Sequence, residues 1–281
     1  MPGPDMKPVL SIEDLNVSFG KNTVAAVSHV SFDVGRERVG IVGESGSGKS
    51  TTGRAIMRLL SPGATVFAKR LDLDGRPLLS MSERQMGKIR GKDIALIMQD
   101  PRYSLNPVLT VGKQIAEAAR LHLNLRGAAA RLAAEAMLER VCIRDAKRVM
   151  GQYPHQISGG MGQRVMIAMM LLARPKLVIA DEPTSALDVS VRKDVLTLLD
   201  ELVRENDSGL ILISHDLRMV SAFCERIIVM YAGRIVETLK RLEDASHPYT
   251  KGLIAAMPDP RHPVRRLAVL DRAKIDLERA G

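Results

Sequence analysis

A glycine-rich segment at residues 43–50 reads Gly-Glu-Ser-Gly-Ser-Gly-Lys-Ser and matches the pattern G-x-x-x-x-G-K-[ST] in full. A short apolar run at residues 39–42 precedes it, and residues 51–60 show helical spacing before Ser-Pro-Gly ends the pattern. A loop between a buried strand and a helix start lets successive backbone N–H groups converge on phosphate oxygens. The helix N-terminus adds a partial positive charge. We therefore predict a phosphate-binding loop, and the alternative is a Gly/Ser-rich turn that binds nothing.

The side chains of this loop suit a nucleoside triphosphate and its metal ion. Lys49 can reach the β- and γ-phosphates, and Ser50 can ligate Mg²⁺. We predict that ATP and Mg²⁺ bind here and that Lys49 also acts in catalysis. The residues predicted to contact the nucleotide in this segment are Gly43, Glu44, Ser45, Gly46, Ser47, Gly48, Lys49, Ser50 and Thr51.

A second apolar run, at residues 177–180, ends in Asp181 and Glu182. A strand here would deliver both carboxylates to the C-terminal edge of the sheet, beside the phosphate-binding loop. Asp181 suits a role in holding Mg²⁺, and Glu182 would then polarise the attacking water as general base. Adjacent acidic residues after a strand are often only a solvated turn. Together with the loop at residues 43–50, the pattern favours the catalytic interpretation.

Ser158, Gly159 and Gly160 form a second glycine-rich turn before an apolar helical run. Ser158 can cap that helix or bind a phosphate, and the backbone N–H groups behind it form another anion site. A chain with one nucleotide has no need of two phosphate sites. We therefore expect this turn to face the nucleotide of a second ATPase subunit, and the alternative is a helix cap without a ligand.

Short apolar strands alternate with amphipathic helices along the chain, which indicates a mainly parallel sheet covered by helices. The predicted fold is α/β: a P-loop NTPase core of the RecA-like type with an antiparallel β subdomain and an inserted α-helical subdomain. We place the ATPase domain at residues 5–250, the helical subdomain at about 108–172, and a short C-terminal extension at 251–281. Residues 100–107 contain two prolines and are predicted to form a loop.

Composition narrows the possible partners. Nothing approaches 18 uninterrupted apolar residues, and the Pro-rich N-terminus lacks the apolar core of a signal peptide, so we expect a cytoplasmic protein. The net charge of +9 favours anionic partners, but aromatics make up only 3%, which argues against a stacking platform for nucleic acid.

Cys142 and Cys224 lack metal-ligand spacing and are predicted to be two reduced core thiols.

These motifs occur in the order found in the ATPase subunits of ABC transporters, and the chain resembles that family over nearly its whole length. The resemblance implies further roles. Gln99 looks like the glutamine that senses the γ-phosphate and the metal, and His215 looks like the catalytic switch histidine. Phe19 looks like the aromatic residue that stacks on adenine, with a core position as the alternative. Asp188 looks like the aspartate that communicates between paired sites.

Within the family, the chain is most similar to the oligopeptide, dipeptide and nickel importer group. Three sequence motifs are typical of that group. They lie at residues 153–161 (Tyr-Pro-His-Gln-Ile-Ser-Gly-Gly-Met), at 100–107 and at 247–250 (His-Pro-Tyr-Thr). Four features depart from the usual patterns: Ile157 and Met161 in the signature, Gly162 in place of an arginine, and Arg-Glu-Arg at residues 36–38. Many relatives carry a Cys-rich tail, but no cysteine follows Cys224, so we predict no iron–sulfur cluster.

The resemblance implies a peripheral subunit on the cytoplasmic face of the inner membrane that powers uptake of peptides or a related small solute, with nickel as another candidate. Its implied partners are two transmembrane permease subunits, a second ATPase subunit that is a copy or a sister chain, and indirectly an extracytoplasmic solute-binding protein. An ABC ATPase acting on nucleic acid or the ribosome is the alternative from another class, although we predict no nucleic-acid partner. A P-loop kinase is another alternative, but it would assign no function to the turn at Ser158 or to Asp188.

Overall fold

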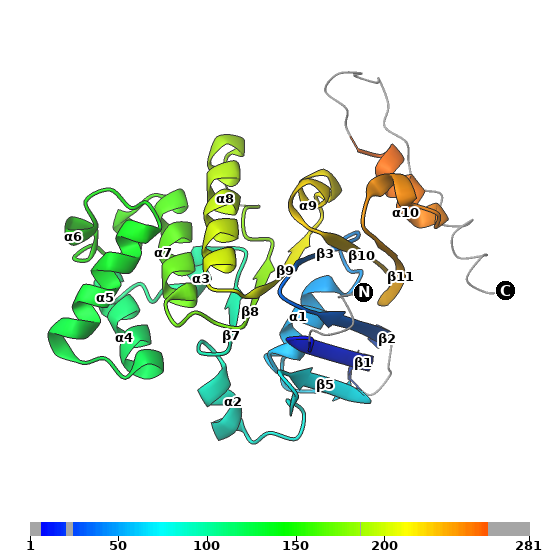
Figure 1. Ribbon diagram of the computed structural model, residues 1–281, viewed down its shortest axis with the longest axis horizontal. Coiled ribbons are helices and arrows are strands. Elements are labelled where there is room, and N and C mark those ends of the chain that lie inside the picture. Colours follow the sequence, from blue (N-terminus) through cyan, green and yellow to red (C-terminus); the bar gives the residue numbers. More distant parts are fainter. Residues whose placement is uncertain (1–6, 21–24, 186, 258–281) are drawn as a thin grey trace. The chain divides into compact units, whose positions relative to one another are not determined.

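The computed structural model of the protein describes residues 7–20, 25–185 and 187–257, and Figure 1 labels its main helices and strands. The chain divides into two compact units, one formed by the residues up to Pro77 together with those from Ile211 onward, and the other by Leu78–Leu210. The predicted boundaries of the helical subdomain, about 108–172, and of the C-terminal extension stay predictions.

The first unit contains an antiparallel sheet in the order β2-β1-β5-β6, with β4 also paired to β1. Leu10 lies opposite Val34 on one side and Leu73 on the other, and all three side chains are fully buried. Alternation of buried and exposed residues along β2 puts one face into the core. The strands are β1 (Leu10–Phe19), β2 (Ala25–Val34), β4 (Ala64–Phe67), β5 (Arg70–Leu73) and β6 (Arg76–Pro77).

The same unit contains the strands that carry the glycine-rich loop. β3 pairs in parallel with β10, β10 pairs antiparallel with β11, and every residue of β9 is buried. Continuous burial is typical of parallel strands covered on both faces. The elements are β3 (Arg38–Val42), β9 (Gly209–Ser214, starting in the second unit), β10 (Arg226–Tyr231), β11 (Arg234–Leu239), α1 (Lys49–Ile56), α9 (Leu217–Phe223), η2 (Leu242–Asp244) and α10 (Pro248–Ala255).

The second unit combines two parallel strands with a group of packed helices. Ile94 of β7 lies opposite Leu177 of β8, and α7 packs against β7, α4 and α5. Most apolar side chains of α7 after its first turn are buried, namely those of Val165, Met166, Ile167, Ala168 and Leu171. The elements are α2 (Glu83–Ile89), β7 (Ile94–Ile97), α3 (Pro101–Ser104), α4 (Val111–Leu123), α5 (Gly127–Arg140), α6 (Ala146–Val149), η1 (Pro154–Gln156), α7 (Gly159–Leu171), β8 (Leu177–Asp181) and α8 (Val189–Glu205).

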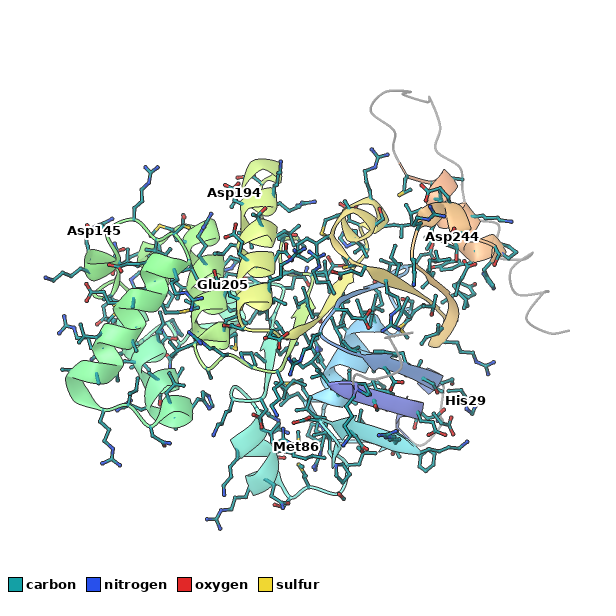
Figure 2. The ribbon with its side chains drawn as sticks, in the orientation of Figure 1. His29, Met86, Asp145, Asp194, Glu205 and Asp244 are labelled. Atoms are coloured by element: carbon teal, nitrogen blue, oxygen red, sulfur yellow. The ribbon has the colours of Figure 1, made fainter. Side chains whose placement is uncertain are left out.

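Helix α8 illustrates the amphipathic pattern. Val195, Leu199 and Leu202 are buried on one face, whereas Asp194 and Glu205, labelled in Figure 2, are exposed. Apolar residues at intervals of three and four produce such a face in a helix with 3.6 residues per turn. The exposed Glu205 forms an ion pair with Arg140 at the end of α5.

The prediction that residues 100–107 form only a loop is wrong for Pro101–Ser104, which form the single helical turn α3. Pro101 occupies the first helical position, where a missing N–H costs nothing, and the Asp100 carboxylate accepts the Arg102 N–H as N-cap.

The prediction of two core thiols is also wrong for Cys142. Its side chain is exposed at the turn after α5, where the backbone takes a left-handed conformation, whereas Cys224 is buried.

Candidate functional site

The segment at residues 43–50 joins β3 to α1, as predicted, and its last two residues, Lys49 and Ser50, already belong to the helix. Gly48 is the N-cap of α1 with a φ of 96°, a left-handed conformation that L side chains rarely adopt. A Cβ atom on Gly48 would lie 2.6 Å from the carbonyl oxygen of Ala26, so only glycine fits. The loop is closed by a hydrogen bond from Ser47 N–H to the Glu44 carbonyl at 3.2 Å. The chain therefore turns sharply and directs the first N–H groups of α1 toward the loop.

Lys49 is the first residue of α1, and only 7% of its surface is exposed. Its ammonium donates hydrogen bonds to the carbonyl oxygens of Gly43 at 2.7 Å and Glu44 at 2.8 Å, and to Ser47 Oγ at 3.3 Å. A buried cation must be paired or hydrogen-bonded to be tolerated. The loop itself supplies these acceptors, so Lys49 lies across the loop in a position from which it can contact an anion bound there.

The loop is also held from the outside by residues distant in the sequence. The Gly233 N–H, in the turn between β10 and β11, donates to the Ser47 carbonyl at 3.1 Å. The Glu44 N–H donates to the hydroxyl of Tyr249, on α10, at 3.0 Å. Sequence reasoning did not assign Tyr249 to the site. The signal that could have identified it is the motif His-Pro-Tyr-Thr at residues 247–250, which had been given no role.

Phe19 and His215 belong to the same unit as the loop. Phe19 is the last residue of β1 and is 40% exposed, so it is not a core residue. His215 is exposed and follows β9 directly. The next residue, Asp216, caps α9 by accepting the Met219 N–H at 2.9 Å, and its own N–H donates to Ser214 Oγ at 3.1 Å. These bonds fix the backbone on which His215 is presented.

In the second unit, Asp181 and Gln99 lie at the same end of two paired strands. Ile97 of β7 is in register with Ala180 of β8, so the residues that follow both strands share the C-terminal edge of the pair. Asp181 ends β8 and is 8% exposed, whereas Gln99 is exposed. Glu182 follows with a φ of 51°, a left-handed conformation that costs a non-glycine residue about 1–2 kcal/mol.

Ser158 caps α7, because its Oγ accepts the Met161 N–H at 3.3 Å. Ser158 and Gly159 are exposed, so the N-terminus of α7 is open to an external anion. Gly160 is half-buried, and a Cβ atom there would lie 3.1 Å from Val191 on α8. Asp188 is exposed at the N-cap of α8, and its side chain makes no capping bond.

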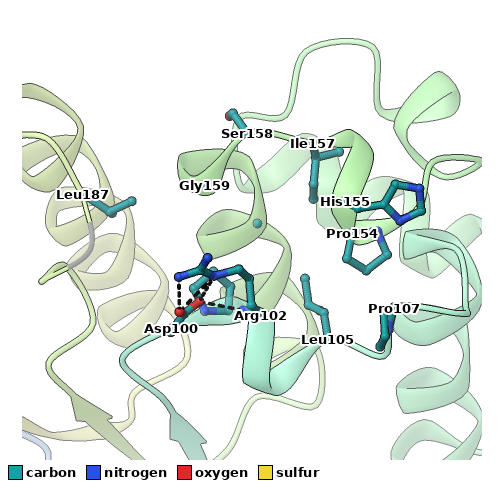
Figure 3. A pocket seen from close by; sticks show the side chains of 12 residues that line it. Asp100, Arg102, Leu105, Pro107, Pro154, His155, Ile157, Ser158, Gly159 and Leu187 are labelled. Carbon is teal, nitrogen blue, oxygen red and sulfur yellow. Dashed lines mark hydrogen bonds and ion pairs between the residues drawn. The ribbon is translucent and has the colours of Figure 1, made fainter.

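A cavity of about 540 Å³ lies beside this turn within the second unit (Figure 3). Gly162 lines it and lies near Pro101. The Arg102 guanidinium at its edge pairs with Asp100 at 2.7 Å, and these hydrogen bonds hold the pKa of the Asp100 carboxyl below its usual range. The cavity was not predicted from the sequence. Its other lining residues are Leu105, Pro107, Pro154, His155, Ile157, Ser158, Gly159 and Leu187.

The predicted site residues therefore form two groups, one in each unit. The first group contains the residues of the loop from Gly43 to Thr51, Phe19 and His215, and the second contains Gln99, Ser158, Gly159, Gly160, Asp181, Glu182 and Asp188. Across the described ranges, no cluster of three or more His, Cys, Asp or Glu side chains could hold a metal ion without other ligands. No helix in that part of the chain has both the length and the apolar character needed to cross a membrane.

Comparison with protein families matches residues 27–185, more than half of the chain, to the family described as ABC transporter. A glutathione import ATP-binding protein of Escherichia coli K12, GsiA, is 47% identical over 262 residues, which cover 89% of this chain and 42% of that protein. The chain thus spans less than half the length of the glutathione import proteins it matches. A putative peptide import ATP-binding protein of Brucella abortus is 45% identical, with 90% of this chain and 78% of that protein covered.

Solved structures of ATP-binding cassettes share the fold. The cassette MJ0796, in a dimeric post-hydrolysis state bound to ADP and Pi, superposes with a TM-score of 0.71 at 28% identity and covers 82% of this chain and 98% of its own. The protein cbiO1 of Clostridium perfringens, part of the transporter complex cbiONQ, gives a TM-score of 0.69 at 26% identity, with 84% and 90% covered. The predicted fold class, a P-loop NTPase core of α/β type, is confirmed.

Proposed function

The chain belongs to the ABC transporter family, and we propose that it is the ATP-binding and ATP-hydrolysing subunit of an importer that takes up peptides or a related small solute, with nickel as a second candidate. The observation that carries the proposal is the loop before α1, where the buried Lys49 ammonium lies on the carbonyl oxygens of Gly43 and Glu44. The relatives named as glutathione and peptide import ATP-binding proteins support the choice of cargo class.

In this proposal the loop binds the phosphates of ATP. Backbone N–H groups of the loop from Ser45 onward and of the first turn of α1, apart from that of Ser47, donate to the phosphate oxygens, and the N-terminus of α1 adds its partial positive charge. Lys49 keeps its hydrogen bond to the Gly43 carbonyl, turns its other N–H donors from Glu44 and Ser47 to the β- and γ-phosphates, and stabilises the charge that develops on the transferred group. Phe19, which is exposed enough to accept a planar ring, stacks on adenine.

The donor set suits Mg²⁺. The Ser50 hydroxyl, the Asp181 carboxylate and the Gln99 amide all offer oxygen ligands, which Mg²⁺ prefers, and Mg²⁺ is commonly held by one or two such groups together with the substrate phosphates. When bound, the ion neutralises phosphate charge. The Ser50 hydroxyl, the Asp181 carboxylate and the Gln99 amide are proposed to hold it.

Glu182 and His215 are proposed to act on the attacking water and the γ-phosphate. The Glu182 carboxylate accepts a proton from the water as general base, and its left-handed backbone fits a residue whose position is determined by function. His215 contacts the γ-phosphate from a backbone held by Asp216 and Ser214. The water oxygen then forms the new bond to phosphorus as the bond to the β-phosphate oxygen breaks.

Two ATPase subunits are proposed to enclose the nucleotides between them. Ser158, Gly159 and Gly160 of one subunit would bind the γ-phosphate held by the other, through the open N-terminus of α7. Asp188 communicates between the two sites. The dimeric state of the similar cassette MJ0796 supports this arrangement. The second subunit is a copy or a sister chain.

The remaining partners are two transmembrane permease subunits, which this chain would drive from the cytoplasmic face of the inner membrane, and an extracytoplasmic solute-binding protein acting through them. The proposal is tested in a strain that lacks the chain and is complemented with wild type, Lys49→Ala or Lys88→Ala. Lys88 is an exposed lysine on α2 and serves as the matched control.

Uptake of labelled glutathione, labelled tripeptides and radioactive nickel is measured in each strain. We expect peptide uptake to be lost on deletion and restored by wild type and Lys88→Ala, but not by Lys49→Ala. Restoration of nickel uptake alone would change the cargo to nickel. Uptake of all three solutes that is unaffected by the deletion would contradict the importer function.

A further inference from the structure

The motif His-Pro-Tyr-Thr at residues 247–250 forms the start of α10 in the first unit. His247 is the N-cap, Pro248 occupies the first helical position, and Tyr249 and Thr250 are fully buried. A tyrosine buried to this degree normally has a hydrogen-bond partner for its hydroxyl. Neither the phosphate contacts nor the catalytic roles described above use this motif.

The Tyr249 ring packs against Tyr231, the last residue of β10, with centroids 4.5 Å apart and planes tilted by 42°. This tilted contact lies within the centroid separations of about 4.5–7 Å at which aromatic rings interact. The turn that follows Tyr231 donates the Gly233 N–H to the Ser47 carbonyl, so the same strand end also holds the phosphate-binding loop. Tyr249 is therefore placed against the loop by packing that involves β10.

The Tyr249 hydroxyl accepts the Glu44 N–H at 3.0 Å, across 205 residues of sequence. The peptide unit that contains this N–H also contains the Gly43 carbonyl, which accepts the Lys49 ammonium at 2.7 Å. The C=O and N–H of a trans peptide point in opposite directions. One peptide unit is thus held on one side by Tyr249 and on the other by Lys49.

Gly43 is the residue about which this peptide could rotate. Its φ is 152°, and a Cβ atom would lie 2.2 Å from the Met230 carbonyl oxygen, so the loop runs directly against β10. Glycine offers little intrinsic resistance to rotation of the adjacent peptide. The hydrogen bond from Glu44 to Tyr249 supplies that resistance and keeps the Gly43 oxygen directed at Lys49.

The start of α10 is itself bound to β11. One carboxylate oxygen of Glu237 accepts the N–H and the hydroxyl of Ser246, both at 2.6 Å, and the His247 N–H at 3.1 Å. Burial acts to raise the pKa of Glu237, but these hydrogen bonds outweigh it and lower the pKa to about 2.

We propose that Tyr249 is a positioning residue of the nucleotide site: its hydroxyl fixes the Gly43–Glu44 peptide that holds Lys49, so the loop is organised for phosphate before ATP arrives. This inference rests on the proposed ATP site at residues 43–50. It assigns the His-Pro-Tyr-Thr motif to nucleotide affinity. Tyr249 acts through the loop backbone and needs no contact with substrate.

The test compares wild type with Tyr249→Phe, which keeps the ring and removes the hydroxyl, and with Tyr103→Phe, which removes a hydroxyl from an 84% exposed tyrosine. Titration with a fluorescent ATP analogue gives the affinity, steady-state phosphate release gives kcat and KM, and thermal unfolding monitors the fold. Hydrogen exchange of the Glu44 amide is followed without nucleotide. This last measurement needs only wild type and remains informative if the variant folds poorly.

We expect Tyr249→Phe to weaken nucleotide binding and raise KM by about three- to tenfold, as loss of one hydrogen bond predicts, with kcat nearly unchanged. Exchange of the Glu44 amide should be slow in wild type and faster in the variant. Tyr103→Phe should match wild type. An unprotected Glu44 amide in wild type, or an unchanged affinity in folded Tyr249→Phe, would overturn the inference. Wild type that binds no ATP would instead contradict the proposed function.

Discussion

Replacement of Lys49 by alanine tests the catalytic assignment most directly. The side chain is buried, and its ammonium makes hydrogen bonds of 2.7, 2.8 and 3.3 Å to the loop. Loss of a preorganised cation from the transferring phosphate costs about 3–4 kcal/mol of transition-state stabilisation. At about 1.4 kcal/mol for each factor of ten, ATP turnover should fall about 10²- to 10³-fold.

The free energy of unfolding should change much less. Lys49→Ala removes three hydrogen bonds, but it also removes a buried cation and its desolvation cost. The positive charge lies in the first turn of α1, where the helix dipole opposes it, and alanine has a higher helix propensity. These contributions have opposite signs, and we expect a net change of about 1 kcal/mol, or a shift in Tm of about 2–4 °C.

Phosphate release is measured at saturating ATP for wild type, Lys49→Ala and the control Lys88→Ala, with circular dichroism melts on the same samples. We expect turnover to be lost only in Lys49→Ala, while all three proteins unfold cooperatively at similar temperatures. Turnover above about 10% of wild type in a folded Lys49→Ala protein would refute the assignment of Lys49. Loss of an electrostatic contribution of about 3–4 kcal/mol must lower turnover by much more than tenfold.

Three further predictions concern other residues of the two units. Glu182→Gln should lower hydrolysis by about 10²–10⁴ while ATP binding survives, and the ATP-bound variant should accumulate as a dimer in size-exclusion runs, with the sister chain added if one exists; normal hydrolysis would remove Glu182 from the role of base. Phe19→Ala should weaken nucleotide affinity by a stacking contribution of about 1–3 kcal/mol and spare the maximal rate, whereas an unchanged affinity would exclude stacking on adenine. Because the pKa of Glu237 is lowered from 4.5 to about 2, its contribution to stability should be complete above pH 4.5 and lost as the pH falls toward 2. The difference in Tm between wild type and Glu237→Gln, measured across that range, should therefore shrink as the pH falls, and a constant difference would contradict the assignment.

The phosphate-binding loop could be predicted from the sequence because its requirements are local. Glycine at position 48 and the lysine beside it determine a left-handed turn and a helix start within a few residues. The same holds for Ser158 as the cap of α7, where a hydroxyl bonds an N–H three residues away. Strands such as β2 and β8 could be predicted from their apolar patterns. A strand buried on one face alternates apolar and polar residues, and a strand buried on both faces is apolar throughout.

Residues 100–107 show where local reasoning was insufficient. Proline is compatible with both a loop and the first turn of a helix, and the Asp100 cap favours the turn α3. Whether Phe19 is a core residue or an exposed one was also open, because a phenylalanine at a strand end fits either environment. Its 40% exposure follows from the position of the end of β1 in the sheet, which the strand's own residues do not encode.

By itself, the sequence of this protein determined the ATP-binding loop, the candidate acids and the alternation of strands and helices, since each depends on neighbours within one turn or one strand. Only the tertiary structure decided that Tyr249 contacts the Glu44 N–H and that Glu237 binds the start of α10. Contacts between segments far apart in the sequence depend on how strands pair and helices pack. A local pattern of residues does not indicate which distant segment of the chain it will contact. The local backbone of the glycine-rich loop was thus predictable, whereas the contacts that hold it in place follow only from the tertiary structure.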